Sequence, residues 1–244
     1  MRFAAIADIH GNSHALAAVL ADIAALGIEE VVNLGDHLSG PLEPARTADM
    51  LMARGFPSIR GDQDRHMIEL HRAGDLSRND VRALRQEHVD WLAAQPTTLV
   101  YRDEVFLCHA APDDDAVFWL EEIMADGTPR PSPLARIEAR ATGLDAALIL
   151  CGHSHIPRIV RLSDGRLIVN PGSVGLPGYR ISTPTCYQVE TGTPDACYVI
   201  AEHRCERWSM TFRYVPYDAV PMAALARRYG RPDWANAIAT GWVE

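Results

Sequence analysis

The sequence lacks an excess of positive charge, and it lacks long hydrophobic runs. Its 23 lysine and arginine residues are outnumbered by 32 aspartates and glutamates, which gives a formal net charge of −9 at pH 7. Because DNA and RNA are bound mainly by basic side chains that neutralise phosphates, we expect no nucleic-acid polymer as a partner. No apolar run approaches the roughly 20 residues that a membrane-spanning helix needs, so we expect no membrane association.

Paired cysteines and a secretion signal are also missing. The five cysteines among 244 residues include no Cys-x-x-Cys spacing. We therefore expect free thiols in a reducing compartment rather than a disulfide framework. The segment after Met1 shows no basic stretch followed by an apolar one, which is the mark of a signal peptide. Together these features predict a cytoplasmic protein.

No linker or low-complexity segment divides the chain, which favours a single domain over residues 1–244. Its first part shows three apolar runs that predict short buried strands, with helical spacing between them. The strands are expected at residues 3–7, 31–34 and 57–59, and the helices at residues 14–26 and 43–54. Strands and helices that alternate in this way predict parallel βαβ units.

The second part of the chain has a different pattern. A helical insert is expected at 65–96, and a helical tail at 218–244. Between them, short apolar runs flank turn residues and predict two hairpins, at 97–109 and 158–170. Further strands are expected at residues 185–190, 196–201 and 206–215. The sequence therefore predicts an α/β protein with parallel units first and β-rich hairpins second.

Seven aspartate and histidine residues stand at the ends of predicted strands or just after them. They are Asp8, His10, Asp36, Asp62, His109, His153 and His155. In open α/β sheets, functional groups gather beyond the carboxyl ends of the strands. Because residues i and i+2 of an extended segment point the same way, we expect Asp8 and His10 to share one pocket, and likewise His153 and His155.

Imidazoles and carboxylates that converge in this way indicate bound cations, because buried like charges repel and unpaired ones are costly. Mixed nitrogen and oxygen ligands suit Mn, Fe, Zn or Ni better than Ca or Mg. Seven ligands are too many for one ion and enough for two that share a carboxylate. Each motif alone is weak evidence, since such residues often cap turns or serve a structural role. The prediction depends on their joint occurrence.

Five ordered stretches resemble the motifs of the calcineurin-like metallophosphoesterases, above all those of the compact bacterial and archaeal phosphodiesterase branch. They are ADIHGNSHAL (7–16), LGDHLSGP (34–41), CHAAPDDD (108–115), CGHSHIP (151–157) and VNPGSVGLP (169–177). The resemblance runs from residue 1 to about residue 215. It implies a four-layer αββα sandwich of two mixed β-sheets flanked by helices, with a bimetal site between the loops.

The resemblance also implies a cofactor and an activity. Two divalent transition-metal ions are expected, with Mn favoured. One ion would take Asp8, His10, Asp36 and His155, and the other would take Asp36, Asp62, His109 and His153. Asp36 would bridge them. A metal-bridging hydroxide would attack the phosphorus atom of a small phosphodiester or nucleotide, the expected small phosphorylated substrate.

The third motif departs from the family pattern Gly-Asn-His-Asp/Glu, because this chain reads Gly61-Asp62-Gln63-Asp64. Gln63 occupies the position of the histidine that is thought to protonate the leaving group in many relatives. A glutamine cannot deliver a proton near neutral pH. His37 is a candidate replacement acid, with a packing role as the alternative. We expect Asp64 to be the N-cap of the following helix.

Asp62 replaces a neutral amide and adds one negative charge. Three carboxylates and a hydroxide against two divalent ions give a formal charge of zero. This weakens the attraction for a dianionic monoester more than for a monoanionic diester, so we expect diesters to be preferred. Asn12 and His66 are candidate substrate-binding residues, with capping and surface roles as the alternatives. Asn170 is a candidate hydrogen-bond partner of a ligand histidine.

Two other functions stay open at this point. One is a phosphomonoesterase or protein phosphatase, which the neutral site and the acidic sequence disfavour. The other is a non-catalytic metal-binding scaffold, as in the retromer subunit that shares this fold. The altered third motif keeps the scaffold open, although all four candidate histidine ligands are present.

Overall fold

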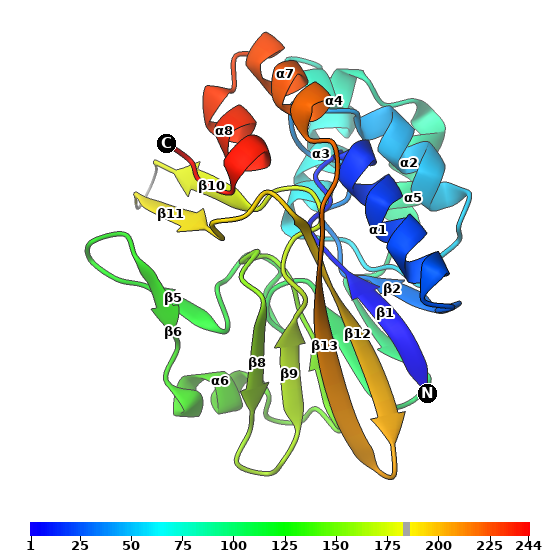
Figure 1. Ribbon diagram of the computed structural model, residues 1–244, viewed down its shortest axis with the longest axis vertical. Coiled ribbons are helices and arrows are strands. Elements are labelled where there is room, and N and C mark those ends of the chain that lie inside the picture. The colour runs from blue at the N-terminus through cyan, green and yellow to red at the C-terminus, as the bar shows by residue number, and fades with distance from the viewer. Residues whose placement is uncertain (183–185) are drawn as a thin grey trace.

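Two mixed β-sheets packed face to face form the centre of the protein, described here by a computed structural model that places residues 1–182 and 186–244 (Figure 1). The first sheet has the strand order β13, β12, β1, β2 and the second has the order β3, β4, β7, β9, β8. The first consists of β1 (Arg2–Ile6), β2 (Val31–Asn33), β12 (Ala196–Arg204) and β13 (Arg207–Val215). The second consists of β3 (Thr98–Tyr101), β4 (Val105–Cys108), β7 (Leu148–Leu150), β8 (Arg158–Arg161) and β9 (Leu167–Asn170).

Parallel pairing places the strand ends that matter on one side of each sheet. β1 pairs with β2 in parallel, and β7 pairs in parallel with both β4 and β9. The remaining pairs of these two sheets are antiparallel. The loops that follow β1, β2, β4 and β7 therefore leave the sheets at neighbouring carboxyl ends, where functional groups can meet.

The core between the sheets follows the two-residue period of the strands. Phe3 and Ala5 of β1 face the second sheet and pack with Leu107 and Leu150. Ile6, on the opposite face of β1, packs under the helices. All of these side chains are fully buried. Because both faces of β1 are covered, the run reads as continuously apolar rather than alternating.

Helices α1 (Ser13–Ala25) and α2 (Pro44–Met52) cover the outer face of the first sheet (Figure 1). Leu16, Val19 and Ile23 recur at helical spacing on α1 and form its buried stripe. The insert contains α3 (Asp62–Arg72), α4 (Asn79–Arg82) and α5 (Gln86–Ala94), which pack together. These helices place the loops after β1 and β2 against one another.

The outer face of the second sheet is covered by a shorter layer. Ile137 of α6 (Leu134–Arg140) packs on Ile149 and Ile168, and the small hairpin of β5 (Glu121–Ile123) and β6 (Pro129–Pro131) lies beside it. Helices, sheet, sheet and helix thus follow one another. The predicted four-layer αββα sandwich is confirmed.

The tail forms a second helical unit above the sheets (Figure 1). It consists of α7 (Val220–Arg228) and α8 (Pro232–Thr240), and α8 packs against the hairpin of β10 (Gly178–Ile181) and β11 (Tyr187–Glu190). Buried Trp234 and Ile238 share a cluster with Leu176. Because Leu176 belongs to the last predicted motif (169–177), the tail is fixed close to the candidate ligands.

Most predicted elements are found, and two of them differ from the prediction. The hairpins at 97–109 and 158–170 are confirmed. The predicted strand at 57–59 is wrong, since only Ser58 bridges Asn33; this edge segment opens with Pro57, which has no amide hydrogen to donate. The insert is three helices rather than one. Of the run predicted at 185–190, residue 185 lies outside the described residues.

Within the described residues, the longest and most apolar helices still fall short of what crossing a membrane requires.

Candidate metal centre

The ligand loops adopt left-handed backbone conformations. The φ angles of Asp8, His10, Asp36, His153 and His155 are 55°, 51°, 54°, 67° and 60°. The expectation that these pairs point the same way because they are extended is therefore wrong. The strands end earlier, and each loop turns sharply to bring its side chains inward. Left-handed backbone costs a non-glycine residue about 1 kcal/mol or more, and such strain concentrates at functional sites.

One group of candidate ligands combines Asp8, His10 and His155, whose ligand atoms lie within 4.8 Å of one another. The Nε2 atoms of His10 and His155 are 3.1 Å apart, and His155 Nε2 lies 3.5 Å from Asp8 Oδ1. His155 Nδ1 donates to the carbonyl oxygen of Leu176 at 2.6 Å. The proton is thus on Nδ1, and in the neutral ring the lone pair of Nε2 faces His10.

A second group combines Asp62, His109 and His153. Asp62 Oδ1 lies 3.2 Å from His109 Nε2 and 3.1 Å from His153 Nδ1. His109 Nδ1 donates to the carbonyl oxygen of Leu34 at 2.7 Å. Among the described residues, His109 Nε2 is buried without a hydrogen-bond partner. A buried lone pair aimed at carboxylates is unfavourable unless a proton or a cation lies between them.

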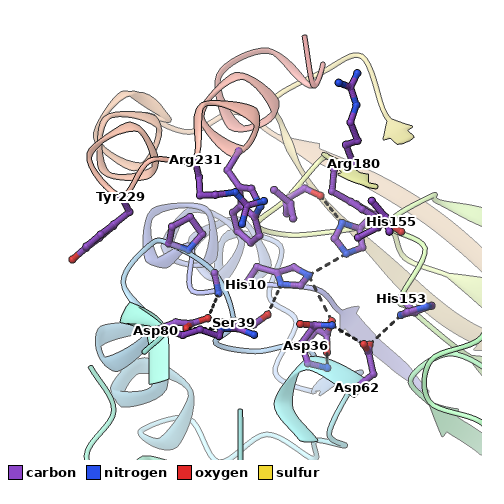
Figure 2. Close-up of a pocket in the computed structure, with 18 of the residues that line it drawn as sticks. His10, Asp36, Ser39, Asp62, Asp80, His153, His155, Arg180, Tyr229 and Arg231 are labelled. Atoms are coloured by element: carbon purple, nitrogen blue, oxygen red, sulfur yellow. Dashed lines mark hydrogen bonds and ion pairs between the residues drawn. The ribbon is translucent and has the colours of Figure 1, made fainter. Parts of the chain in front are cut away.

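Asp36 lies between the two groups. Its Oδ2 is 3.7 Å from His10 Nε2, and its Oδ1 is 3.5 Å from His109 Nε2. Figure 2 shows Asp36 beside both His10 and Asp62 on the floor of the pocket. One carboxylate with an oxygen toward each group can bridge two ions. The residues present therefore fit two divalent metal ions, each with nitrogen and oxygen ligands.

The pKa values within the cluster show how strongly its charged groups interact. Burial raises the pKa of the Asp8 carboxyl well above its usual range, against the opposing influence of His109. Burial lowers the pKa of His109, but Asp36 and the other carboxylates outweigh it and hold this pKa well above its usual range. The cluster thus retains protons that bound cations would displace.

The imidazoles of His10 and His155 favour the neutral form that binds metal. Burial lowers the pKa of His10, and it lowers the pKa of His155 well below its usual range. Both rings are therefore neutral at pH 7 and offer lone pairs. Burial opposes ionisation of Asp62, but the neighbouring His109 and His153 rings outweigh it and hold the pKa of Asp62 well below the usual range. Asp62 is therefore ionised and offers carboxylate oxygens that could bind a cation.

The altered third motif stands at the start of α3. Gln63 lines the pocket, its Nε2 donates to Asp62 Oδ2 at 2.7 Å, and its backbone amide donates to Asp36 Oδ1 at 3.0 Å. Asp64 is not the N-cap; Gly61 is, and Asp64 lies in the first turn and accepts from the Gly61 amide at 3.0 Å. The helix begins earlier than expected because glycine leaves the capping role to a carboxylate three residues later.

Asp64 also explains the position of His37. The His37 ring is fully buried, its Nδ1 donates to Asp64 Oδ2 at 2.7 Å, and it packs edge-on against Trp91. It lies outside the described pocket lining. His66 stays half-exposed on the surface of α3, near Glu69, and is likewise outside the lining. The structure thus gives His37 the packing role and His66 the surface role.

The two asparagines hold loops in place. Asn12 caps α1 by accepting from the Ala15 amide, and its side-chain amide donates to Gly175 O and Tyr217 Oη, each at 2.9 Å. Asn170 donates to Gly152 O at 2.7 Å and to Ser154 Oγ at 3.0 Å. The structure therefore places Asn170 against the backbone of the His153–His155 loop, whereas backbone carbonyls and Ser39 contact the Nδ1 atoms of three of the histidines.

The sequence analysis missed the aromatic surroundings of the ligands. Trp234 lies edge-on to His10 with ring centroids 5.8 Å apart, Tyr179 lies edge-on to His155 at 4.7 Å, and Phe118 is tilted on His153 at 5.3 Å. These residues come from the tail, the β10–β11 hairpin and the loop before β5. Their role depends on tertiary contacts with loops far away in the chain, so no local pattern indicated it.

Comparison with known proteins decides the family. The family model described as the calcineurin-like phosphoesterase superfamily domain matches residues 1–193. The chain belongs to this superfamily. The match covers all seven candidate ligands and the two mixed sheets except β12 and β13. The metallophosphoesterase family predicted from the motifs is therefore confirmed.

Solved structures from bacteria and archaea share the fold. A metallophosphoesterase from Sphaerobacter thermophilus is 23% identical with a TM-score of 0.73, and the match covers 99% of each chain. A hypothetical protein from Pyrococcus horikoshii is 19% identical with a TM-score of 0.74, and covers 98% of each. An uncharacterized protein from Methanocaldococcus jannaschii is 23% identical over 204 residues, which is 71% of this chain and 76% of that protein.

Proposed function

We propose that this phosphoesterase holds two divalent transition-metal ions, with Mn²⁺ favoured, and hydrolyses small phosphodiesters or nucleotides. One observation carries the proposal. The two carboxylate oxygens of Asp36 face two separate groups of histidine and aspartate ligands on the floor of a pocket of about 780 Å³. When bound, the ions would supply Lewis-acid activation of the phosphoryl group and of a water nucleophile.

The residues of the chain have distinct parts in this reaction. Leu34 and Leu176 accept hydrogen bonds through their carbonyl oxygens and so orient His109 and His155 with Nε2 toward the site. Such partners fix the tautomer and the direction of a ligating imidazole. The backbone amide of Gln63 donates to Asp36 Oδ1 and so holds this carboxylate in the bridging position. The site is thus organised before any ion or substrate arrives.

The charge of the ligand set favours a diester. Asp8, Asp36 and Asp62 neutralise three of the four positive charges that two divalent ions bring. The residual attraction is smaller than it would be with an amide in place of Asp62, and a dianionic monoester loses more from this than a monoanionic diester. A phosphodiester of small size also fits the pocket volume, which lies in the range of ordinary ligand sites.

A matched pair of substrates tests the proposal. The diester bis(p-nitrophenyl) phosphate and the monoester p-nitrophenyl phosphate release the same leaving group, so leaving-group acidity does not affect the comparison. With Mn²⁺ supplied, we expect a higher kcat/KM for the diester. His155→Ala should abolish turnover and lower the number of ions per chain, whereas His71→Ala, on a partly exposed part of α3, should do neither.

The alternatives correspond to other outcomes of this experiment. A monoester kcat/KM equal to or above that of the diester identifies a phosphomonoesterase. Two bound ions per chain with neither ester cleaved identify a metal-binding scaffold. Either result would refute the proposed phosphodiesterase activity.

A further inference from the structure

The pocket continues well beyond the candidate metal ligands. Ser77, Arg78 and Asn79 line one side of it, and the β10–β11 hairpin lines another. A third wall comes from the tail, whose Tyr229, Arg231 and Trp234 lie above the ligand floor. In Figure 2, Tyr229 and Arg231 lie at the turn between the two tail helices, on the side of the pocket opposite Asp36 and Asp62. A phosphate group alone would leave most of this volume empty.

The tail wall is outside the part of the chain that the family model matches. The match ends at residue 193, and the wall begins at Tyr229. The wall is nevertheless joined to the metal floor. Trp234 is buried, with only 8% of its surface exposed, and its ring packs edge-on against His10. A β-carbon on Gly40 would come within 2.3 Å of this ring, so the loop after the bridging ligand is shaped to receive it.

Arg231 is held as a flat, positively charged surface. Its Nε and Nη2 donate to the two carboxylate oxygens of Asp233 at 2.9 and 2.6 Å. Its guanidinium group lies over the Trp234 ring, 5.4 Å from the centroid. The side chain is still 44% exposed and lines the pocket. A guanidinium that is fixed in this way loses little freedom when a second planar group binds.

Tyr229 adds an aromatic ring to the tail wall, two residues before Arg231 in the chain. It follows α7 directly, is 43% exposed, and lines the same pocket. The β10–β11 hairpin adds the partly exposed side chains of Ile181 and Tyr187 to the pocket lining. Exposed aromatic rings and guanidinium planes are the groups on which nucleobases stack, and such stacking tolerates any base.

We propose that the tail is the nucleoside subsite of this enzyme, with a nucleobase stacked on Arg231 and Tyr229 while the phosphodiester lies on the metal floor. This inference rests on the proposed phosphodiesterase function and narrows its substrate to nucleoside phosphodiesters. The substrate spans from the floor at Asp36 to the tail, and Trp234 connects the two ends of the site.

Two esters that differ only in the non-leaving group test the subsite. Thymidine 5′-(p-nitrophenyl phosphate) and methyl p-nitrophenyl phosphate are both monoanionic diesters with the same leaving group. We expect the native protein to cleave the thymidine ester with a higher kcat/KM, by roughly 5-fold to 150-fold, the range that stacking of one base contributes. Equal kcat/KM values for the two esters would overturn the subsite and leave the phosphodiesterase standing.

Substitutions in the tail wall test whether Tyr229 and Arg231 cause the preference for the thymidine ester. Tyr229→Ala and Arg231→Gln should each lower kcat/KM for the thymidine ester and leave the methyl ester unchanged. Arg231→Lys keeps the charge without the plane and should resemble Arg231→Gln. The matched controls are Arg228→Gln on the exposed end of α7 and Tyr214→Ala, 47% exposed on β13, which should change neither rate. Equal losses on both esters would contradict a nucleoside subsite.

A binding measurement distinguishes failure of the proposed phosphodiesterase function from failure of the proposed nucleoside subsite. Thymidine 5′-monophosphate should bind the Mn²⁺-loaded protein in calorimetry, and more weakly after Tyr229→Ala. If neither ester is cleaved but this binding and its loss in the variant persist, the phosphodiesterase function is wrong and the subsite stands. If thymidine 5′-monophosphate binds the native protein and the variant equally, the subsite is wrong.

Discussion

Gln63 is held by two hydrogen bonds, and it has no proton to give to a leaving group. Its amide groups are committed to the carboxylates of Asp36 and Asp62. His37, the other candidate acid, is buried against Asp64 and Trp91. At the scale of single residues, the site therefore has ligands for metal but lacks the histidine acid of the family pattern among its described lining residues.

Restoring the family residue should change the response to the leaving group. Because general-acid catalysis contributes about 10²–10⁴-fold and matters most for poor leaving groups, Gln63→His should raise kcat for alkyl phosphodiesters and barely change kcat for p-nitrophenyl esters. Rates across leaving groups of increasing pKa measure this. Efficient cleavage of alkyl esters by the native protein, with no gain in the variant, would point to a different proton donor.

Asp62 sets the charge of the site. Asp62→Asn keeps an oxygen ligand and removes one negative charge, so the attraction for a dianion should grow relative to that for a monoanion. We expect the ratio of monoester to diester kcat/KM, at matched leaving group, to rise roughly tenfold or more. The exposed Asp75, just beyond α3, gives the control variant Asp75→Asn. An unchanged or lower ratio would refute the charge argument.

At the scale of elements, Asp64 joins the start of α3 to the loop after β2. Its carboxylate is fully buried and accepts from the backbone amides of Asp36, His37 and Gly61 and from the His37 ring. The contact fixes Asp36 relative to the third motif. It is a structural role that becomes visible only when both loops are placed.

Removing this carboxylate should lower the free energy of unfolding. Asp64→Ala leaves His37 and three amides without their buried partner, and loss of one member of a buried pair typically costs about 3–5 kcal/mol. Urea unfolding of the metal-free protein measures the change. Asp75→Ala, on an exposed turn, should cost less than about 1 kcal/mol. A similar small cost for Asp64→Ala would show that these loops are held by other contacts.

Asp22 ties α1 to the first sheet in a pH-dependent way. It accepts from Arg213 Nη2 at 2.7 Å and from Tyr198 Oη at 2.6 Å, and the hydrogen bond from Arg213 is the main reason that its pKa is lowered. A lowered folded-state pKa means that ionised Asp22 stabilises the protein above the unfolded-state pKa of about 4. That stabilisation disappears as the pH falls through the folded-state pKa.

Comparison with the variant Asp22→Asn measures the pH-dependent stabilisation by ionised Asp22. The difference in the free energy of unfolding between the native protein and the variant should be largest near neutral pH and should shrink below about pH 4. Urea titrations from pH 3 to pH 7 give the curve. A difference that stays constant over this range would show that the ionisation of Asp22 does not contribute.

At the scale of the whole molecule, the sequence predicted those features that depend on local pattern and on the order of the strands. Apolar runs separated by turns and helices predicted most of the strands, whereas the resemblance to the family predicted their arrangement in two facing sheets. The candidate ligands were predicted from the carboxyl ends of those strands. The reason given for the direction of Asp8 and His10 was wrong, because left-handed loops rather than extended strands aim them. The structure brings the candidate ligands together as predicted from their positions in the chain, but through a different backbone conformation.

Roles that depend on distant partners were not predictable. His37 looked available because its neighbours in sequence are a ligand and a leucine, whereas its buried partner Asp64 lies 27 residues away. The tail looked like an ordinary helical end, yet Trp234 reaches His10 across the whole chain. Such contacts depend on how α8 packs on the β10–β11 hairpin. The helical periodicity of the sequence does not predict this packing.

Anomalous scattering from crystals grown with excess Mn²⁺ tests the central claim most directly. The account predicts two peaks in the cluster, one beside His10 and His155 and the other beside His109 and His153, with Asp36 contacting both. In His155→Ala crystals the first peak should weaken preferentially. A single peak, or none, in the native protein would contradict the two-ion centre on which the proposed activity depends.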